Sequence, residues 1–135
     1  MVHAEKVVTA MQRGTANTRW RDFADVYILS RRHDIDGREL STAVGNVMRY
    51  RQTTAVPLVD VLEGYAQIGQ ARWAAWRRKQ RLDDRLPERF EDVVDAVTAF
   101  ADPALLRPDF DNLWDSAERV WKPRNASHPR SFGDS

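Results

Sequence analysis

The chain has 135 residues, 42% of them hydrophobic and 30% charged, and its formal net charge is only +1; this suits one domain with a packed core and gives no bulk attraction to nucleic acid. It contains no cysteine and only three widely separated histidines, which excludes disulfides and leaves no expected metal site. No apolar run approaches the roughly 20 residues that a membrane-spanning helix needs, and the first residues lack the apolar core of a signal peptide, so we expect a soluble, cytoplasmic protein.

Apolar residues recur every three or four positions through most of the chain, which predicts helices rather than strands. The first two predicted helices span about 3–13 and 19–32, and Gly14 suits the left-handed position that follows a helix. A connection of about five residues favours antiparallel packing of these two helices. The residues expected to be largely buried along the chain are Phe23, Tyr27, Val44, Val47, Trp73, Val94, Val97 and Phe100.

A capping sequence opens the third predicted helix, at about 37–51. Asp36 occupies the N-cap position and Glu39 follows three residues later, which is the spacing of a capping box. The next helical stretch covers about 58–82 and contains two helix-weakening glycines. The positions at which this stretch is expected to break are Gly64 and Gly69.

The last third of the chain predicts two further helices. Pro87 opens the first of them and Pro103 ends it, because the residue before a proline disfavours the helical conformation. A short final helix is predicted over about 110–121, and the polar, proline-containing segment 122–135 is interpreted as a flexible tail. The fold class is therefore all-α, a bundle of about five to six helices over residues 1–121.

Two carboxylates and one amine form the candidate catalytic site. Asp22 and Asp25 lie one helical turn apart, so they share a face, and Lys6 on the preceding helix converges with them if the two helices are antiparallel. A lysine beside two carboxylates can hold a nucleotide phosphate next to a metal ion or a general base. The same residues also fit solvated helix charges that neighbouring arginines neutralise. In either case we expect these charges to be mostly exposed.

The runs Glu5–Met11 and Asn17–Tyr27 give the chain a resemblance to a known family. They resemble the AbiEii/AbiGii type of nucleotidyltransferase toxin, in which a lysine-containing helix is followed by a helix with two aspartates. The resemblance implies that Lys6 contacts nucleotide phosphates and that Asp22 or Asp25 completes the active site. It also implies that complete members use a nucleoside triphosphate and Mg²⁺, modify an acceptor such as the tRNA 3′ end, and have an antitoxin as partner.

The chain departs from that family in one respect. Complete members carry a Gly-Ser motif and an Asp-x-Asp pair that holds the metal ions, whereas this sequence contains no Gly-Ser dipeptide. Asp34 and Asp36 have the Asp-x-Asp spacing, but they precede Gly37, so a turn and a helix cap explain them. We therefore expect the C-terminal helical region of such a toxin, inactive alone. The alternative is a non-enzymatic helical module that binds an antitoxin or RNA.

A basic and aromatic run at 72–81 is the candidate nucleic-acid surface. RNA backbones and unstacked bases bind cations and aromatic rings. Trp73 and Trp76 lie one helical turn apart, however, and are interpreted as core residues beside a solvated basic face. The cations that would contact RNA under the other interpretation are Arg72, Arg77, Arg78, Lys79 and Arg81.

Overall fold

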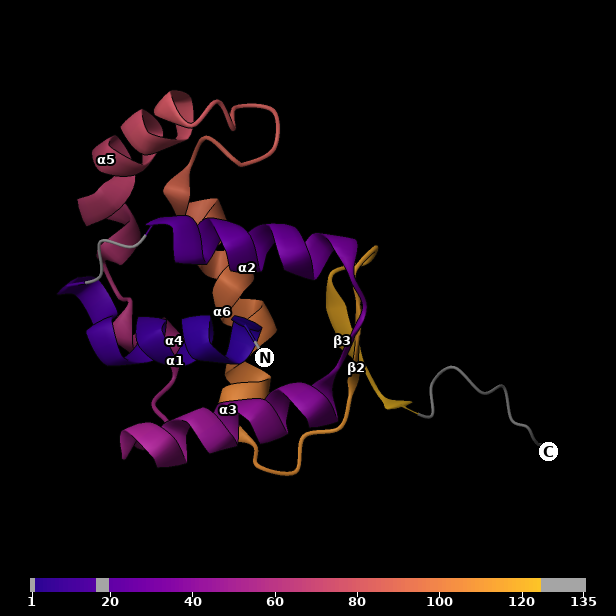
Figure 1. The fold of residues 1–135 in the computed structure, drawn as a ribbon. Coiled ribbons are helices and arrows are strands. Elements are labelled where there is room, and N and C mark those ends of the chain that lie inside the picture. Colours follow the sequence, from indigo (N-terminus) through magenta and orange to yellow (C-terminus); the bar gives the residue numbers. More distant parts are fainter. Residues whose placement is uncertain (1, 17–19, 125–135) are drawn as a thin grey trace.

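The computed structural model describes residues 2–16 and 20–124, and within them the chain forms mainly helices (Figure 1). The helices are α1 (Val2–Arg13), α2 (Trp20–Arg32), α3 (Gly37–Arg51), α4 (Leu58–Val61), α5 (Tyr65–Lys79) and α6 (Phe90–Leu106). The remaining elements are a 3₁₀ turn, η1 (Gly14–Ala16), and three short strands, β1 (Ile35–Asp36), β2 (Leu113–Asp115) and β3 (Val120–Lys122). The predicted helical bundle is confirmed.

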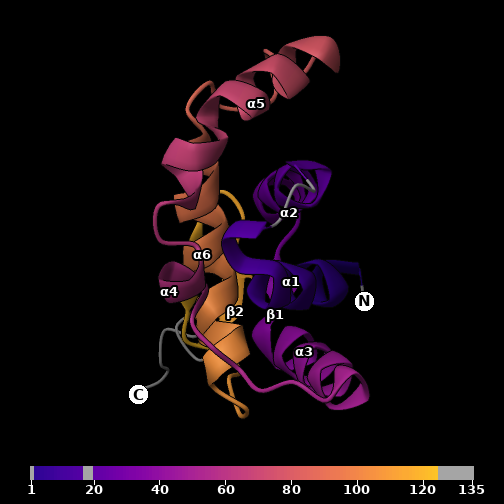
Figure 2. The ribbon, with the colours of Figure 1, turned by 90° about the vertical axis from the view of Figure 1, so that its left-hand side faces the viewer.

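Helix α6 forms the centre of the molecule. Figure 2 shows α1, α2 and α3 on one side of α6 and α4 on the other. Helix α5 packs against the start of α6, where the Trp73 and Phe90 rings stack with centroids 4.8 Å apart. Of the residues predicted to be buried, Tyr27 and Val47 are only half-buried. The fully buried ones are Phe23, Val44, Trp73, Val94, Val97 and Phe100.

Local capping sets the start of α3 and the break before α5. The Asp36 side chain accepts a hydrogen bond from the Arg38 backbone N–H at 2.9 Å, as the capping sequence predicts. Gly37 approaches the Phe110–Asn112 segment so closely that a Cβ there would collide with the Asn112 carbonyl oxygen. The stretch 58–82 breaks at Gly64, which has a φ of 79° and so favours glycine.

Helix α6 does not end at Pro103, contrary to the sequence prediction. It continues to Leu106, with Ala104 and Leu105 both buried. The apolar contacts of this last turn outweigh the local preference of a residue before proline for extended backbone. Asp102, the residue before Pro103, caps α4. Its carboxylate accepts hydrogen bonds from the backbone N–H groups of Leu58 and Val59 at 2.7 and 3.3 Å.

The predicted helix over 110–121 is wrong, because this segment forms the β2–β3 hairpin. Trp114 pairs with Trp121 across the two strands, and β1 completes a three-stranded antiparallel sheet in the order β1-β2-β3. The Asp115 carboxylate accepts hydrogen bonds from two backbone N–H groups within the turn. The predicted tail begins too early, since Lys122 belongs to β3 and Arg124 pairs with Asp36. Residues 125–135 of that tail lie outside the described part of the chain.

Candidate functional site

The first two helices bring the three candidate catalytic residues together. Helices α1 and α2 run in opposite directions (Figure 1), as predicted. The Lys6 Nζ lies 2.9 Å from Asp22 Oδ1 and 3.1 Å from Asp25 Oδ2, so one ammonium bridges both carboxylates. We call these three residues the Lys6 cluster. The prediction that they share one surface is confirmed.

The burial of the Lys6 cluster differs from the sequence expectation. The Asp22 side chain is only 5% exposed and that of Lys6 only 19%, whereas that of Asp25 is 35% exposed. The expectation that the three charges are mostly exposed is therefore wrong. Asp22 lies in the first turn of α2, beside Phe23 and Ala24, which are both buried in the core. The site is consequently graded, with a buried carboxylate at its base and a half-exposed one at its mouth.

The electrostatics of the Lys6 cluster keep the lysine charged. Burial acts to lower the pKa of Lys6, but the hydrogen bonds to Asp22 and Asp25 outweigh it and leave the pKa above its ordinary value. The ammonium thus occupies the space between the carboxylates in which a metal ion would bind. Among residues 2–16 and 20–124, no group of three or more acidic or histidine side chains could hold a metal ion. The Lys6 cluster by itself therefore does not fit Mg²⁺.

His3 is a neighbour of the Lys6 cluster that the sequence analysis did not select. It lies one helical turn before Lys6 and is half-buried, with its ring centroid 6.2 Å from that of Phe100. Burial lowers the pKa of His3, and the charges of His33 and Lys6 lower it further, so the imidazole is neutral at pH 7. Its Nε2 atom is buried and has no hydrogen-bond partner among the described residues. The only sequence signal that placed His3 beside the cluster was its spacing of three residues from Lys6 within one predicted helix.

The Asp34 and Asp36 carboxylates are occupied by structural contacts. Asp34 Oδ1 accepts hydrogen bonds from the Ser116 backbone N–H and hydroxyl, at 2.9 and 2.8 Å, and both lower the pKa of Asp34. Partial burial acts to raise the pKa of Asp36, but the hydrogen bonds from Arg124 and the Arg38 N–H lower it below its ordinary value. Both side chains thus join β1 and the start of α3 to the β2–β3 region. Their contacts support the interpretation as a turn and a cap.

The basic run on α5 divides into two kinds of cation. Arg77 is held inside the fold, because its guanidinium donates to the carbonyls of Leu86 and Asp83 at 2.8 and 2.6 Å. Trp73 is completely buried, which confirms its place in the core, while Trp76 is half-buried. The predicted RNA-contacting cations that are exposed are Arg72, Arg78, Lys79 and Arg81.

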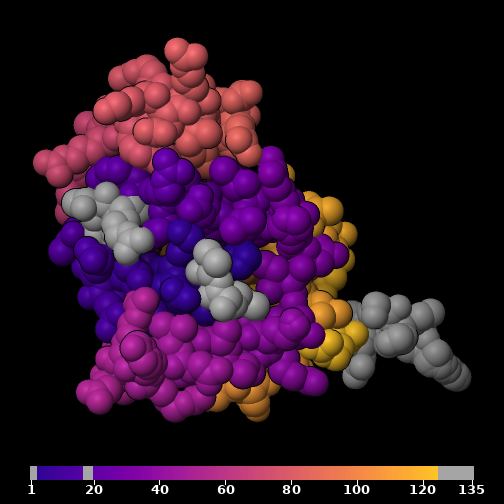
Figure 3. Space-filling view, in the orientation of Figure 1, coloured from indigo at the N-terminus to yellow at the C-terminus, as the bar shows by residue number. Residues whose placement is uncertain are grey.

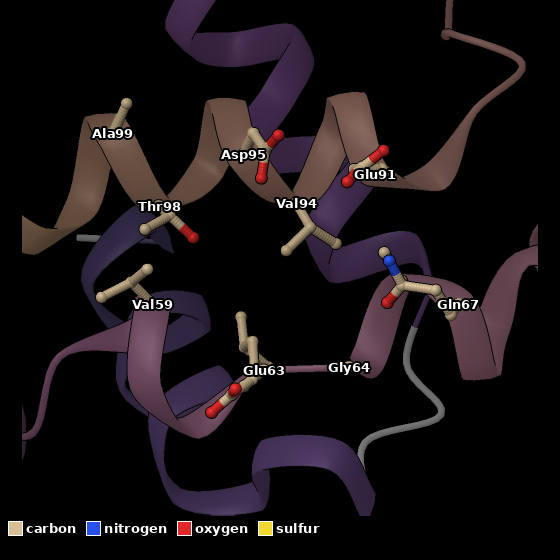
Figure 4. A pocket seen from close by; sticks show the side chains of 11 residues that line it. Val59, Glu63, Gly64, Gln67, Glu91, Val94, Asp95, Thr98 and Ala99 are labelled. Atoms are coloured by element: carbon tan, nitrogen blue, oxygen red, sulfur yellow. The ribbon is translucent and has the colours of Figure 1, made fainter.

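A hollow of about 300 Å³ lies on the other side of α6, between α4, α5 and α6. Figure 4 shows Glu63, Glu91 and Asp95 among its lining residues, with the Val94 side chain of α6 pointing into the hollow. None of its lining residues is basic. A triphosphate would find no cation to contact there, whereas the Lys6 cluster supplies one, so the Lys6 cluster remains the stronger candidate.

Comparison with protein families assigns the chain to a family. The family model described as "Nucleotidyl transferase AbiEii toxin, Type IV TA system" matches residues 1–116, a range that contains the whole Lys6 cluster. Searches of curated proteins and of solved structures find no match to the chain. In the described part of the molecule, no helix has the length and apolar character needed to cross a membrane. The chain belongs to the AbiEii nucleotidyl transferase toxin family of type IV toxin–antitoxin systems.

Proposed function

We propose that this chain forms the helical side of a nucleotidyl-transfer centre, in which Lys6 binds the phosphate groups of a nucleoside triphosphate. The observation that carries the proposal is the bridging position of the Lys6 ammonium, 2.9 and 3.1 Å from two carboxylates of the next helix. Those contacts hold the long lysine side chain in one orientation, so less conformational entropy is lost when a phosphate binds.

Charge explains why the chain would need a further domain. The Lys6 cluster holds one ammonium and two carboxylates, a formal charge of −1, so on its own it does not attract a triphosphate. We propose that Lys6 and the half-exposed Asp25 act only beside a Gly-Ser and Asp-x-Asp domain, and that the chain alone transfers no nucleotide. In the complete assembly the nucleotide would pass to an acceptor such as the tRNA 3′ end, in the cytoplasm and under the control of an antitoxin.

The first test uses the chain alone. Labelled nucleoside triphosphates, Mg²⁺ and total tRNA are incubated with the purified protein, and incorporation into RNA is measured. We expect no incorporation above background. Robust incorporation that survives further purification, and is abolished by Asp34→Ala or Asp36→Ala, would contradict the proposal, because those carboxylates would then be catalytic rather than structural.

The second test supplies a Gly-Ser and Asp-x-Asp domain. This domain, taken from a complete family member, is joined ahead of residue 1, and transfer is measured with Lys6→Gln and with Arg32→Gln, which removes one exposed cation of α2, as the control. Loss of one phosphate-binding cation should reduce the rate about 100-fold, while the control keeps the rate. Circular dichroism checks that both variants fold. Equal rates in the two variants would favour the non-enzymatic helical module.

A further inference from the structure

A second hollow adjoins the Lys6 cluster on the other side of Asp25. It has a volume of about 250 Å³ and lies between α2 and the end of α5 with the connection that follows. Figure 3 shows atoms of these two regions adjoining on one face of the molecule. We call it the Trp76 groove; the residues used below are Arg21, Asp25, Trp76, Leu82 and Arg85.

The Trp76 groove combines one aromatic ring with two cations. Trp76 is half-buried and lies against the Trp73 ring, with centroids 5.5 Å apart, so its indole is held in place from the core. The Arg21 guanidinium carbon lies 6.0 Å from the Trp76 ring centroid. Arg21 and Arg85 are exposed, and neither has an ion pair with another described residue. An indole held in place, with one guanidinium near its ring and a second cation lining the same groove, suits a planar, electron-rich ring attached to a phosphate.

The size of the Trp76 groove limits the ligand to part of a larger molecule. Whole small-molecule ligands occupy pockets of about 300–1,000 Å³, and this groove, at about 250 Å³, is smaller. Further exposed cations follow at the end of α5, at Arg78, Lys79 and Arg81. A single base therefore fits the groove while the backbone that bears it continues past these cations.

We propose that the Trp76 groove binds one unstacked base of a single-stranded RNA, with Arg21 and Arg85 contacting the phosphates on either side. Asp25 belongs to both the groove and the Lys6 cluster, so the bound strand lies beside the proposed phosphate site. This inference deepens the proposed function and rests on it, because it identifies where the acceptor strand enters. The exposed cations among the predicted nucleic-acid residues then contact the backbone, and Trp76, which the sequence analysis assigned to the core, stacks on the base.

The test is direct binding of a fluorescein-labelled single-stranded RNA of about 12 nucleotides, measured by anisotropy without nucleotide or Mg²⁺. Trp76→Leu removes the stacking surface and should weaken binding about tenfold. Arg21→Gln and Arg85→Gln should each weaken it about fivefold through the loss of one phosphate contact. Arg32→Gln is the matched control, because Arg32 is also exposed on α2 and the charge change is identical; it should change the affinity less than about twofold.

Three outcomes would overturn the inference. A blunt RNA duplex of the same sequence that binds as tightly as the single strand would show that no unstacked base is needed. A control variant that weakens binding as much as Arg85→Gln would show general charge attraction. Unchanged affinity in Trp76→Leu and Arg85→Gln would show that RNA binds elsewhere. Because Trp76→Leu also alters packing against Trp73, the exposed Arg85→Gln variant keeps the test decisive if the first variant unfolds.

Failure of this inference can be separated from failure of the proposed function. The RNA measurement contains no triphosphate, so it does not depend on Lys6. If groove variants bind RNA normally while Lys6→Gln abolishes transfer in the joined protein, the groove assignment falls and the proposed function stands. If Lys6→Gln transfers normally and the groove variants lose RNA, the chain is an RNA-binding module instead.

Discussion

Two pairs of aspartates lie on or just after α2, and they are held in different ways. Asp22 and Asp25 share a charged side chain from another helix, Lys6, and Asp22 is buried. Asp34 and Asp36 instead accept hydrogen bonds from nearby turn and cap groups, such as the Ser116 and Arg38 backbone N–H groups. The first pair shares one ammonium from another helix, whereas the second accepts hydrogen bonds from backbone N–H groups and the Ser116 hydroxyl, with Arg124 as a further partner of Asp36.

This difference shows how the contacts of an aspartate pair can distinguish a structural role from a possible functional one. Asp34 and Asp36 have the spacing that metal-binding sites in the wider family use, yet their lone pairs are already engaged in joining β1 to β2 and α3. Asp22 and Asp25 have an ordinary helical spacing, yet both contact one ammonium, the kind of group that also binds phosphate. The donors around a carboxylate, rather than its sequence spacing, separate the two roles.

The largest effect should come from removing the cation of the first pair. Lys6→Ala leaves the buried Asp22 without its ammonium partner, and we expect the free energy of unfolding to fall by about 3 kcal/mol, near the lower end for a broken buried ion pair because Asp25 is partly exposed. Urea unfolding measures it. Lys79→Ala, an exposed lysine, should change stability by less than about 0.5 kcal/mol. If both variants unfolded at the same urea concentration, the two aspartate pairs would not differ as described.

A smaller effect should come from removing the cap of the second pair. Asp36→Ala deletes the hydrogen bond to the Arg38 N–H and the contact with Arg124, and should cost about 1 kcal/mol. Asp36→Asn keeps a good N-cap acceptor and should retain most of the stability when both variants are compared by the same urea unfolding measurement. A loss from Asp36→Ala as large as that from Lys6→Ala would indicate that Asp36 has a role beyond capping.

The smallest effect should appear in the pH dependence of stability, because the second pair of aspartates affects stability at acidic pH and Lys6 affects it at alkaline pH. The pKa of Asp34 and that of Asp36 are lowered in the folded chain, so their stabilisation is present above about pH 4 and is lost as the pH falls through the folded values. The pKa of Lys6 is raised, so its stabilisation is present below about pH 10 and is lost as the pH rises further. Unfolding midpoints measured across pH should show a smaller alkaline decline in Lys6→Ala, because the raised pKa values of Tyr65 and Lys122 also contribute to that decline, and an unchanged acidic one.

Local sequence signals predicted those helices that begin with a capping residue and carry apolar residues along one face. The range 37–51 matched α3 because Asp36 caps it and Leu40 and Val44 fall on one buried face. The hairpin escaped prediction because Leu113, Val120 and Trp121 are also spaced like a helical stripe, and each strand has only three residues. Its stability comes from distant partners that no window of sequence contains, such as the bond from Trp114 Nε1 to the Ser30 carbonyl.

The sequence predicted that Lys6 would meet Asp22 and Asp25, but it did not predict that Asp22 would be buried. A short connection between two helices sufficed to bring Lys6 to Asp22 and Asp25. The burial of Asp22 depends on tertiary packing around α2, and the Trp76 groove depends on Arg21 and Arg85, which are far apart in sequence. Residue spacing within one helix could not reveal a groove whose two walls come from different elements.

The hydrogen bonds from Trp114 to Ser30 and from Trp121 to Phe100 can form only after the hairpin has been synthesised, so they limit when the domain can finish folding. Residues 30 and 114 are 84 positions apart, so a ribosome that adds roughly 5–20 residues per second needs about 4–17 s between them. Throughout that interval the apolar faces of α1, α2 and α3 remain uncovered, because α6 and the hairpin that pack against them have not yet been made. The nascent chain therefore exposes apolar surface that the folded domain buries, and such surface is prone to aggregate until synthesis is complete.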